Sequence, residues 1–243
     1  MIHIPVKRFL FLLLTGAVLF AGCKKGPGVT TRLLVYNATL TTSSLTATWS
    51  GTSLTPTALA QGNVTGTATA PYQVVPAGTN NIIVKSGSNV LFDKNIYGGG
   101  GIAYSLLVYD SSKTAASPSL LLLTDNLALT DSIQPKYRFI NCSPDTTINL
   151  YLVDSRADTV RVEGSTFIGK SPDPASFQAF TTMTTRTGVY TPYIYKAGNT
   201  TLLLKGADIT FSSLKAYSLI YSGTSSSSGA GALKLSVIIL PVE

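Results

Sequence analysis

A serine and a lysine three positions apart, Ser212 and Lys215, are the residues whose spacing best suits nucleophilic chemistry. A lysine at this spacing can activate a serine without histidine when the serine begins a helix and Ser-Asp-Asn and Lys-Thr-Gly elements follow. Neither element follows in this chain, and the segment lies between two strand-like runs. We therefore interpret it as a turn and expect no catalytic residue there.

Three aspartates, Asp145, Asp154 and Asp158, form the one acidic group whose spacing could suggest a metal site or a carboxylate pair. They lack the regular spacing of ligands in a calcium-binding loop. Spacing alone does not identify the paired carboxylates of a glycosidase. Asp145 follows Ser143-Pro144, where an aspartate commonly bonds the backbone of its own turn. We expect turns here, with no metal and no cofactor.

The N-terminal segment has the layout of a secretory signal peptide. Lys7 and Arg8 precede an apolar run, Phe9 to Phe20, which is shorter than the roughly 20 residues that a membrane-spanning helix needs. Leu19-Phe20-Ala21-Gly22-Cys23 resembles the bacterial lipobox. The resemblance implies that residues 1–22 are removed and that Cys23 carries diacylglycerol and an acyl chain such as palmitate on its amine. Several acyl chains would hold the protein firmly at a membrane.

Removal of this segment would leave no histidine, because His3 is the one histidine of the chain. The mature protein would then lack the usual general base and metal ligand. The full chain carries a formal net charge of +7. Its basic residues are scattered rather than clustered with stacking aromatics, which argues against a nucleic-acid surface. Lys24-Lys25 lies beside the expected anchor, where it can contact lipid headgroups.

With Cys23 lipidated, Cys142 would have no partner for an intrachain disulfide. It directly follows an apolar run, so we expect a buried, inert thiol. The chain contains twelve tyrosines and one tryptophan. Exposed aromatic rings stack on sugars, which makes a glycan-binding face conceivable. Trp49 falls on the same strand face as Leu45 and Ala47, so we expect it in a core.

Strand-like runs separated by turn residues fill the mature chain, and no long segment shows helical periodicity. The expected strands are Leu33–Ala38, Leu45–Trp49, Tyr72–Val75, Asn81–Val84, Ala103–Tyr109, Tyr137–Cys142, Ile148–Val153, Thr159–Glu163, Tyr190–Tyr195, Thr200–Lys205, Tyr217–Tyr221 and Leu233–Leu240. Many short strands at regular spacing predict an all-β sandwich or barrel.

The two halves resemble each other in three places, in the same order. The matched segments are Leu33–Ala38 with Tyr137–Cys142, Ala77–Lys85 with Ala197–Lys205, and Ala103–Tyr109 with Ala216–Tyr221. This order indicates a tandem duplication. We expect a lipidated tether at 23–31, domain 1 at 32–127, a linker at 128–135 and domain 2 at 136–243, each domain with its own core.

The second copy contains Arg138-Phe139-Ile140-Asn141-Cys142-Ser143-Pro144-Asp145, a strand followed by a Ser-Pro-Asp turn. Ile148–Asp154, Ala197-Gly198 and Ala216-Tyr217-Ser218 follow in that order. This pattern resembles the domain of unknown function 4397. The resemblance covers most of both copies and is closer in the second, since the first has Thr39-Leu40-Thr41 in place of Ser-Pro-Asp. It implies two tandem immunoglobulin-like antiparallel β-sandwiches in a lipoprotein of the kind found in Bacteroidetes, and it supplies no catalytic residues.

Three Asp-Ser/Thr triplets resemble the O-glycosylation motif of exported Bacteroidetes proteins. They place the modifiable hydroxyls on Ser132, Thr146 and Thr159. Ser132, in the expected linker, is the site that we favour.

We expect a non-enzymatic, lipid-anchored envelope protein that acts as a binding or structural module, with envelope proteins or glycans as partners. Two alternatives stay open: a fimbrillin-like subunit that exchanges the strand Leu233–Pro241, and an envelope enzyme that uses aspartates on glycan. No acidic residues follow Cys23 directly. Since such residues resemble surface-export signals, the periplasmic face of the outer membrane is favoured over the cell surface.

Overall fold

The computed structural model describes residues 28–112, 118–128, 134–145, 147–170 and 173–242. The strands are β1 (Thr30–Ala38), β2 (Ser44–Trp49), β3 (Thr52–Ser53), β4 (Leu59–Ala60), β5 (Gln73–Pro76), β6 (Gly78–Ser86), β7 (Asn89–Gly98), β8 (Ala103–Asp110), β9 (Pro118–Asp125), β10 (Lys136–Asn141), β11 (Ile148–Asp154), β12 (Thr159–Ser165), β13 (Thr181–Thr182), β14 (Gly188–Lys196), β15 (Leu202–Lys205), β16 (Ile209–Phe211), β17 (Ala216–Ser222) and β18 (Lys234–Leu240). Three short helices accompany them: η1 (Ile168–Lys170), α2 (Pro174–Gln178) and η2 (Gly229–Gly231). The all-β prediction is confirmed.

Each expected strand has a counterpart, but the structure adds β7, β9 and β16 as well as the two-residue strands. Most of β7 is exposed, so its sequence carries little of the alternation that marks a half-buried strand. In β9 a run of four leucines, Leu120 to Leu123, has no alternation at all. A short apolar run of this kind does not distinguish a strand from a buried helix.

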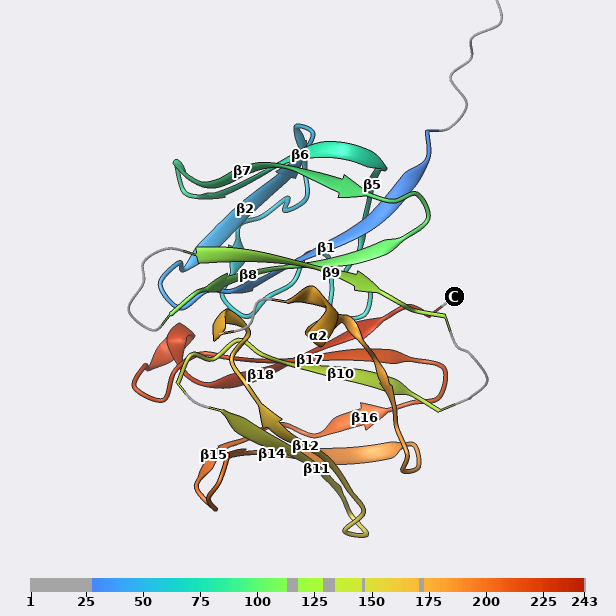
Figure 1. Ribbon diagram of the computed structural model, residues 1–243, viewed down its shortest axis with the longest axis vertical. Coiled ribbons are helices and arrows are strands. Elements are labelled where there is room, and N and C mark those ends of the chain that lie inside the picture. The colour runs from blue at the N-terminus through green and yellow to red at the C-terminus, as the bar shows by residue number, and fades with distance from the viewer. Residues whose placement is uncertain (1–27, 113–117, 129–133, 146, 171–172, 243) are drawn as a thin grey trace, which may run out of the picture.

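Four sheets are stacked as two β-sandwiches (Figure 1). In the first sandwich, the outer sheet has the order β3-β2-β6-β7 and the inner sheet β5-β1-β8-β9. In the second, the inner sheet is β13-β10-β17-β18 and the outer sheet β12-β11-β14-β15. With about 10 Å between packed sheets, the two outer sheets lie about 30 Å apart.

Each sandwich has a core between its own two sheets. Trp49 lies in the first core with Leu45 and Ala47, as its strand alternation predicts, and its indole Nε1 donates to the Pro76 carbonyl over 3.0 Å. In the second core, the rings of Tyr190 and Phe211 meet edge to face with centroids 5.7 Å apart. Such aromatic pairs contribute beyond the apolar area that they bury.

A third apolar core joins the two inner sheets. It contains Leu34, Tyr36 and Leu107 from the first sandwich together with Ile220 and Ile238 from the second. Every residue of β8 and of β17 is buried, because both faces of each inner sheet are covered. The sequence indicated two separate cores and did not indicate this shared one.

The sheets are mainly antiparallel, as expected, and each inner sheet contains one parallel strand pair. β1 is parallel to β8 from Arg32↔Ala103 to Ala38↔Tyr109, and β10 is parallel to β17 from Lys136↔Ala216 to Asn141↔Tyr221. Parallel neighbours need a long crossover connection, and the intervening outer sheet supplies it in both halves.

Two of the three internal sequence matches correspond to equivalent strands, and one does not. β1 and β10 occupy the same sheet position, as do β8 and β17. Ala77–Lys85 forms most of the central strand β6, whereas Ala197–Lys205 forms a turn and the edge strand β15. By sheet position the counterpart of β6 is β14. The similarity of the segments reflects a common turn-and-strand composition rather than a common place in the sheet.

A buried ion pair crosses the interface between the sandwiches. Arg138 Nη1 of β10 lies 2.7 Å from Asp125 Oδ1 of β9, and both side chains are almost fully buried. The guanidinium also donates to Ser218 Oγ (2.8 Å) and Ser105 Oγ (2.7 Å). Ser105 and Tyr72 in turn donate to Asp125 Oδ2. Since donors and acceptors come from both halves, this network fixes one sandwich against the other.

Candidate functional site

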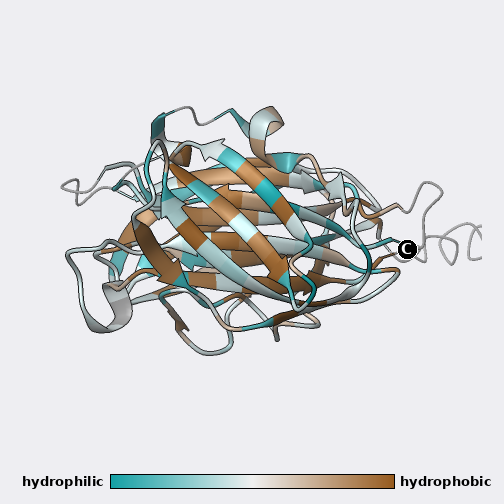
Figure 2. Cartoon of the chain, turned by 90° about the horizontal axis from the view of Figure 1, so that it is seen from below, coloured by the Kyte–Doolittle hydropathy of each residue, from teal (hydrophilic) through white to brown (hydrophobic). Residues whose placement is uncertain are grey.

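The exposed face of the outer sheet β12-β11-β14-β15 carries three tyrosines, which we call the tyrosine platform: Tyr151, Tyr193 and Tyr195. Along β11 and β14 the buried residues alternate with half-buried ones, and the tyrosines fall in the half-buried set. Figure 2 looks toward the molecule from this side and shows hydrophobic and hydrophilic residues alternating along the strands. The alternation arises because successive strand residues point to opposite faces.

Strand register arranges the platform in a row with two cations. Arg161 pairs with Tyr151, Tyr151 with Tyr193, and Tyr193 with Lys205, so one row crosses all four strands. The Arg161 guanidinium lies 5.4 Å from the Tyr151 ring centroid, and the Lys205 ammonium lies 5.5 Å from that of Tyr193. Tyr195 packs on Tyr151 with centroids 5.4 Å apart. Each flanking cation therefore contacts a ring through a cation–π interaction.

A groove of about 380 Å³ adjoins the platform. Tyr193 lines it together with Thr191 and Val153 of the same sheet. Charged side chains from three separate segments complete the lining: Asp154, Arg156, Arg186 and Asp208. Tyr193 thus belongs both to the row of rings and to a polar depression.

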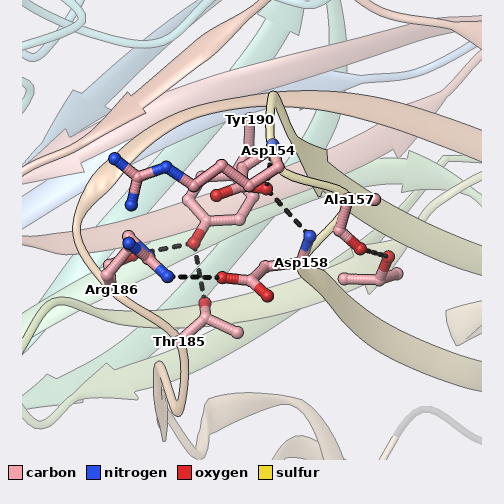
Figure 3. A network of polar contacts seen from close by, with 8 residues as sticks. Asp154, Ala157, Asp158, Thr185, Arg186 and Tyr190 are labelled. Atoms are coloured by element: carbon pink, nitrogen blue, oxygen red, sulfur yellow. Dashed lines mark hydrogen bonds and ion pairs between the residues drawn. The ribbon is translucent and has the colours of Figure 1, made fainter.

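Short hydrogen bonds hold the walls of the groove (Figure 3). Asp154 Oδ1 accepts from the backbone N–H of Arg156 and of Asp158, each over 2.8 Å, and so closes the β11–β12 turn. Arg186 Nη2 lies 3.1 Å from Asp158 Oδ2, which ties the segment before β14 to this turn. The Tyr190 hydroxyl lies 2.8 Å from the Arg186 carbonyl oxygen. Four polar contacts therefore position one end of the groove.

On the opposite wall, Thr191 Oγ1 donates to Asp208 Oδ1 over 2.6 Å. This bond leaves the second carboxylate oxygen of Asp208 available to another donor, because a carboxylate can accept at both oxygens. Stacking surfaces beside fixed carboxylates and guanidinium groups suit a ligand that combines a flat apolar face with several hydroxyl groups.

The structure brings together two of the three aspartates of the acidic group. Asp154 and Asp158 share the β11–β12 turn, whereas Asp145 accepts a hydrogen bond from Ser225 N in the β17–β18 loop. Its sequence neighbours indicated only a local turn and not this contact over 80 positions. Within the described part of the chain, no three His, Cys, Asp or Glu side chains are grouped so that they could hold a metal ion.

The serine–lysine pair lies where the sequence predicted. Ser212 and Lys215 are exposed in the connection between β16 and β17, and Ser212 N donates to the Tyr217 hydroxyl over 2.9 Å. Cys142 is buried, as expected, and burial raises the pKa of its thiol. A thiol held neutral in this way is a poor nucleophile.

The expected modification sites are covered only in part by the described residues. Cys23, Ser132 and Thr146 lie outside them. Thr159 is half-buried at the start of β12, and its hydroxyl donates to the Ala157 carbonyl over 3.2 Å. Among the helices of the described chain, none is long and apolar enough to span a membrane.

Three groove residues, Arg156, Arg186 and Asp208, were not singled out from the sequence. They lie in turns and loops, so no periodicity marks them. The sequence does contain a pattern that marks the tyrosine platform. In Thr191-Pro192-Tyr193-Ile194-Tyr195, the tyrosines share one strand face and the apolar residues share the other. That alternation identifies the outward rings, but it does not say whether another sheet covers them.

In a comparison with known protein families, residues 31–151 match a domain of unknown function, DUF4397. The match covers the first sandwich except Thr30 and continues through β10 into β11. From the sequence we expected the second copy to resemble this family more closely than the first. The match instead covers the first copy and ends within the second, which corrects that expectation. The range contains both Asp125 and Arg138, and therefore crosses the interface that they hold together. No curated protein matches the chain.

Proposed function

Since residues 31–151 belong to the DUF4397 family, whose name carries no activity, we propose from the site itself that this protein is a lipid-anchored glycan-binding module of the bacterial cell envelope. The tyrosine platform and its groove form the binding face. The protein acts by capture and not by catalysis.

One observation carries the proposal: the row from Arg161 through Tyr151 and Tyr193 to Lys205, with Tyr193 also lining a polar groove. A sugar ring offers an apolar face to an aromatic side chain, and its hydroxyl groups need fixed donors and acceptors. Asp208 supplies acceptor oxygens, and Arg156 supplies donors. The two kinds of contact lie side by side on one exposed sheet.

The position of this face fits an anchored protein. The signal-like N-terminus and Cys23 support attachment through lipid. In Figure 1, the beginning of β1 lies toward the opposite side of the molecule from the outer sheet of the second sandwich. A bilayer at the N-terminal end would leave the platform pointing away from the membrane. Envelope glycans could then reach it.

The direct test is titration of envelope polysaccharides against the soluble Cys23→Ser protein. We expect Tyr151→Ala and Tyr193→Ala each to weaken binding about tenfold, equivalent to about 1.4 kcal/mol. The matching Phe variants keep the ring and should bind more tightly than the Ala variants. Val90→Ala, on the outer strand β7 at the other end of the molecule, serves as the control. If no polysaccharide binds, or if both Ala variants bind as the parent does, the proposal fails.

An envelope enzyme is the second candidate, because two carboxylates, Asp154 and Asp208, line the same groove. Release of reducing ends from a bound polysaccharide would favour it. Loss of that release in Asp208→Asn, with binding retained, would assign the activity to the groove.

A further inference from the structure

Four exposed apolar side chains lie on the segments that meet where the described chain begins. Four of the eight large apolar residues that the described chain exposes most are Val29, Val74, Tyr97 and Ile102, and we call these four the apolar rim. Val29 is 70% exposed, Val74 and Tyr97 are each 68% exposed, and Ile102 is 39% exposed. Isolated exposed apolar residues are ordinary, but these four lie on segments at the same end of the first sandwich, next to the expected anchor.

Backbone hydrogen bonds hold the rim residues around the first residues of β1. The Val29 carbonyl accepts from Ala77 N (2.9 Å), and the Ile102 carbonyl accepts from Arg32 N (3.0 Å). Val74 pairs with Arg32 across the β1–β5 ladder. The turn between Tyr97 and Ile102 packs against the Val29 side chain at Gly100, where a Cβ atom would collide with it. The rim is therefore built from three strand ends and one tight turn.

The expected anchor lies within reach of this rim. Only residues 24–28 separate Cys23 from Val29, and six residue steps span at most about 22 Å. Two of these residues are Lys24 and Lys25, which attract anionic headgroups. Tyrosine side chains are favoured at the boundary between headgroups and acyl chains. Chain length, charge and side-chain chemistry all suit a lipid bilayer as the surface that covers the rim.

We propose that the apolar rim rests on the bilayer and fixes the orientation of the anchored protein, so that the tether does not act as a free linker. This inference rests on the lipid anchor of the proposed function and not on the glycan specificity. It means that the two outer sheets have different surroundings: the first lies near the membrane, and the second faces away from it.

Spin-label accessibility in vesicles tests the orientation. Lipidated protein, purified from membranes and placed in vesicles of phosphatidylcholine and phosphatidylglycerol, would carry one nitroxide at Ile102→Cys or Tyr97→Cys. Leu202→Cys, on β15 of the far sheet and 47% exposed, is the matched control. Cys142 does not interfere, because it is buried.

On membrane binding, both rim labels should lose accessibility to an aqueous nickel complex and gain accessibility to oxygen, while the label at 202 should not change. Flotation of the vesicles tests the lipid anchor separately from the contact between the apolar rim and the bilayer. The Cys23→Ser protein serves as the unanchored comparison. If the protein floats and the rim labels stay aqueous, the rim inference is overturned and the anchor stands. If the lipidated protein does not float, both are overturned.

Discussion

Arg138 and Asp125 illustrate how single residues connect the two halves of this protein. Each belongs to a different sandwich, and each is almost fully buried beside the other. Desolvation of an isolated charge is costly, so such a pair persists only when further hydrogen bonds complete it. The two serines and Tyr72 complete it here, and the Arg138 guanidinium also lies 4.7 Å from the Phe180 ring centroid. Two causes raise the pKa of Tyr72: burial is the larger, and the negative charge of Asp125 is the next. The Tyr72 hydroxyl therefore stays protonated and acts as a donor.

Replacement of Arg138 by Ala should lower the free energy of unfolding by about 3–5 kcal/mol, because it leaves a buried carboxylate without its partner charge. Urea titration followed by circular dichroism measures the change. Arg186→Ala is the matched control, since the Arg186–Asp158 pair is about half exposed and such pairs contribute less than about 1 kcal/mol. Equal effects of the two substitutions would contradict the structural role of the Arg138 network.

At the scale of single elements, the contacts of β18 bear on whether this protein is a folded module or a strand-exchanging subunit. It pairs with β17 from Ser222↔Lys234 to Ala216↔Leu240, and Ile238 and Leu240 enter the central core. On its other side, Ile239 N donates to the Ala68 carbonyl of the first sandwich over 2.9 Å. Both edges of β18 therefore make hydrogen bonds within the same chain.

A chain that ends before residue 233 should lose its cooperative unfolding transition and become insoluble, because it lacks the apolar residues that β18 contributes to the core. The intact protein should run as a single band on gels without boiling. The fimbrillin-like alternative makes the opposite prediction. A truncated chain that stays folded and captures a peptide of residues 233–241, or a ladder of stable oligomers, would support that alternative.

For the whole molecule, the shared core predicts how the protein unfolds. Separating the sandwiches would expose both inner sheets and would break the contacts around Arg138. The family match crosses the same boundary and ends in β11, inside the second sandwich. The folding unit is therefore expected to include both halves, although each half has a core of its own.

Calorimetry should show one transition in which the calorimetric and van't Hoff enthalpies agree, which is the criterion for two-state unfolding. Separately expressed chains 32–127 and 136–243 should aggregate or fold only partly, because each exposes an inner sheet. Two resolved transitions, or two fragments that fold independently, would show instead that the interface is a weak contact between autonomous domains.

Local alternation in the sequence determined the β class, the places of most strands and the face on which residues such as Trp49 and Tyr193 lie, because side chains alternate along any strand. The parallel strand pairs, the shared core and the Arg138–Asp125 contact were decided only by the tertiary structure. Their partners come from distant segments, and the pattern of one strand does not specify which sheet covers it. The same limit applies to the candidate site: the sequence indicated outward tyrosines, whereas the pairing register placed Arg161 and Lys205 beside them and the fold left that face uncovered.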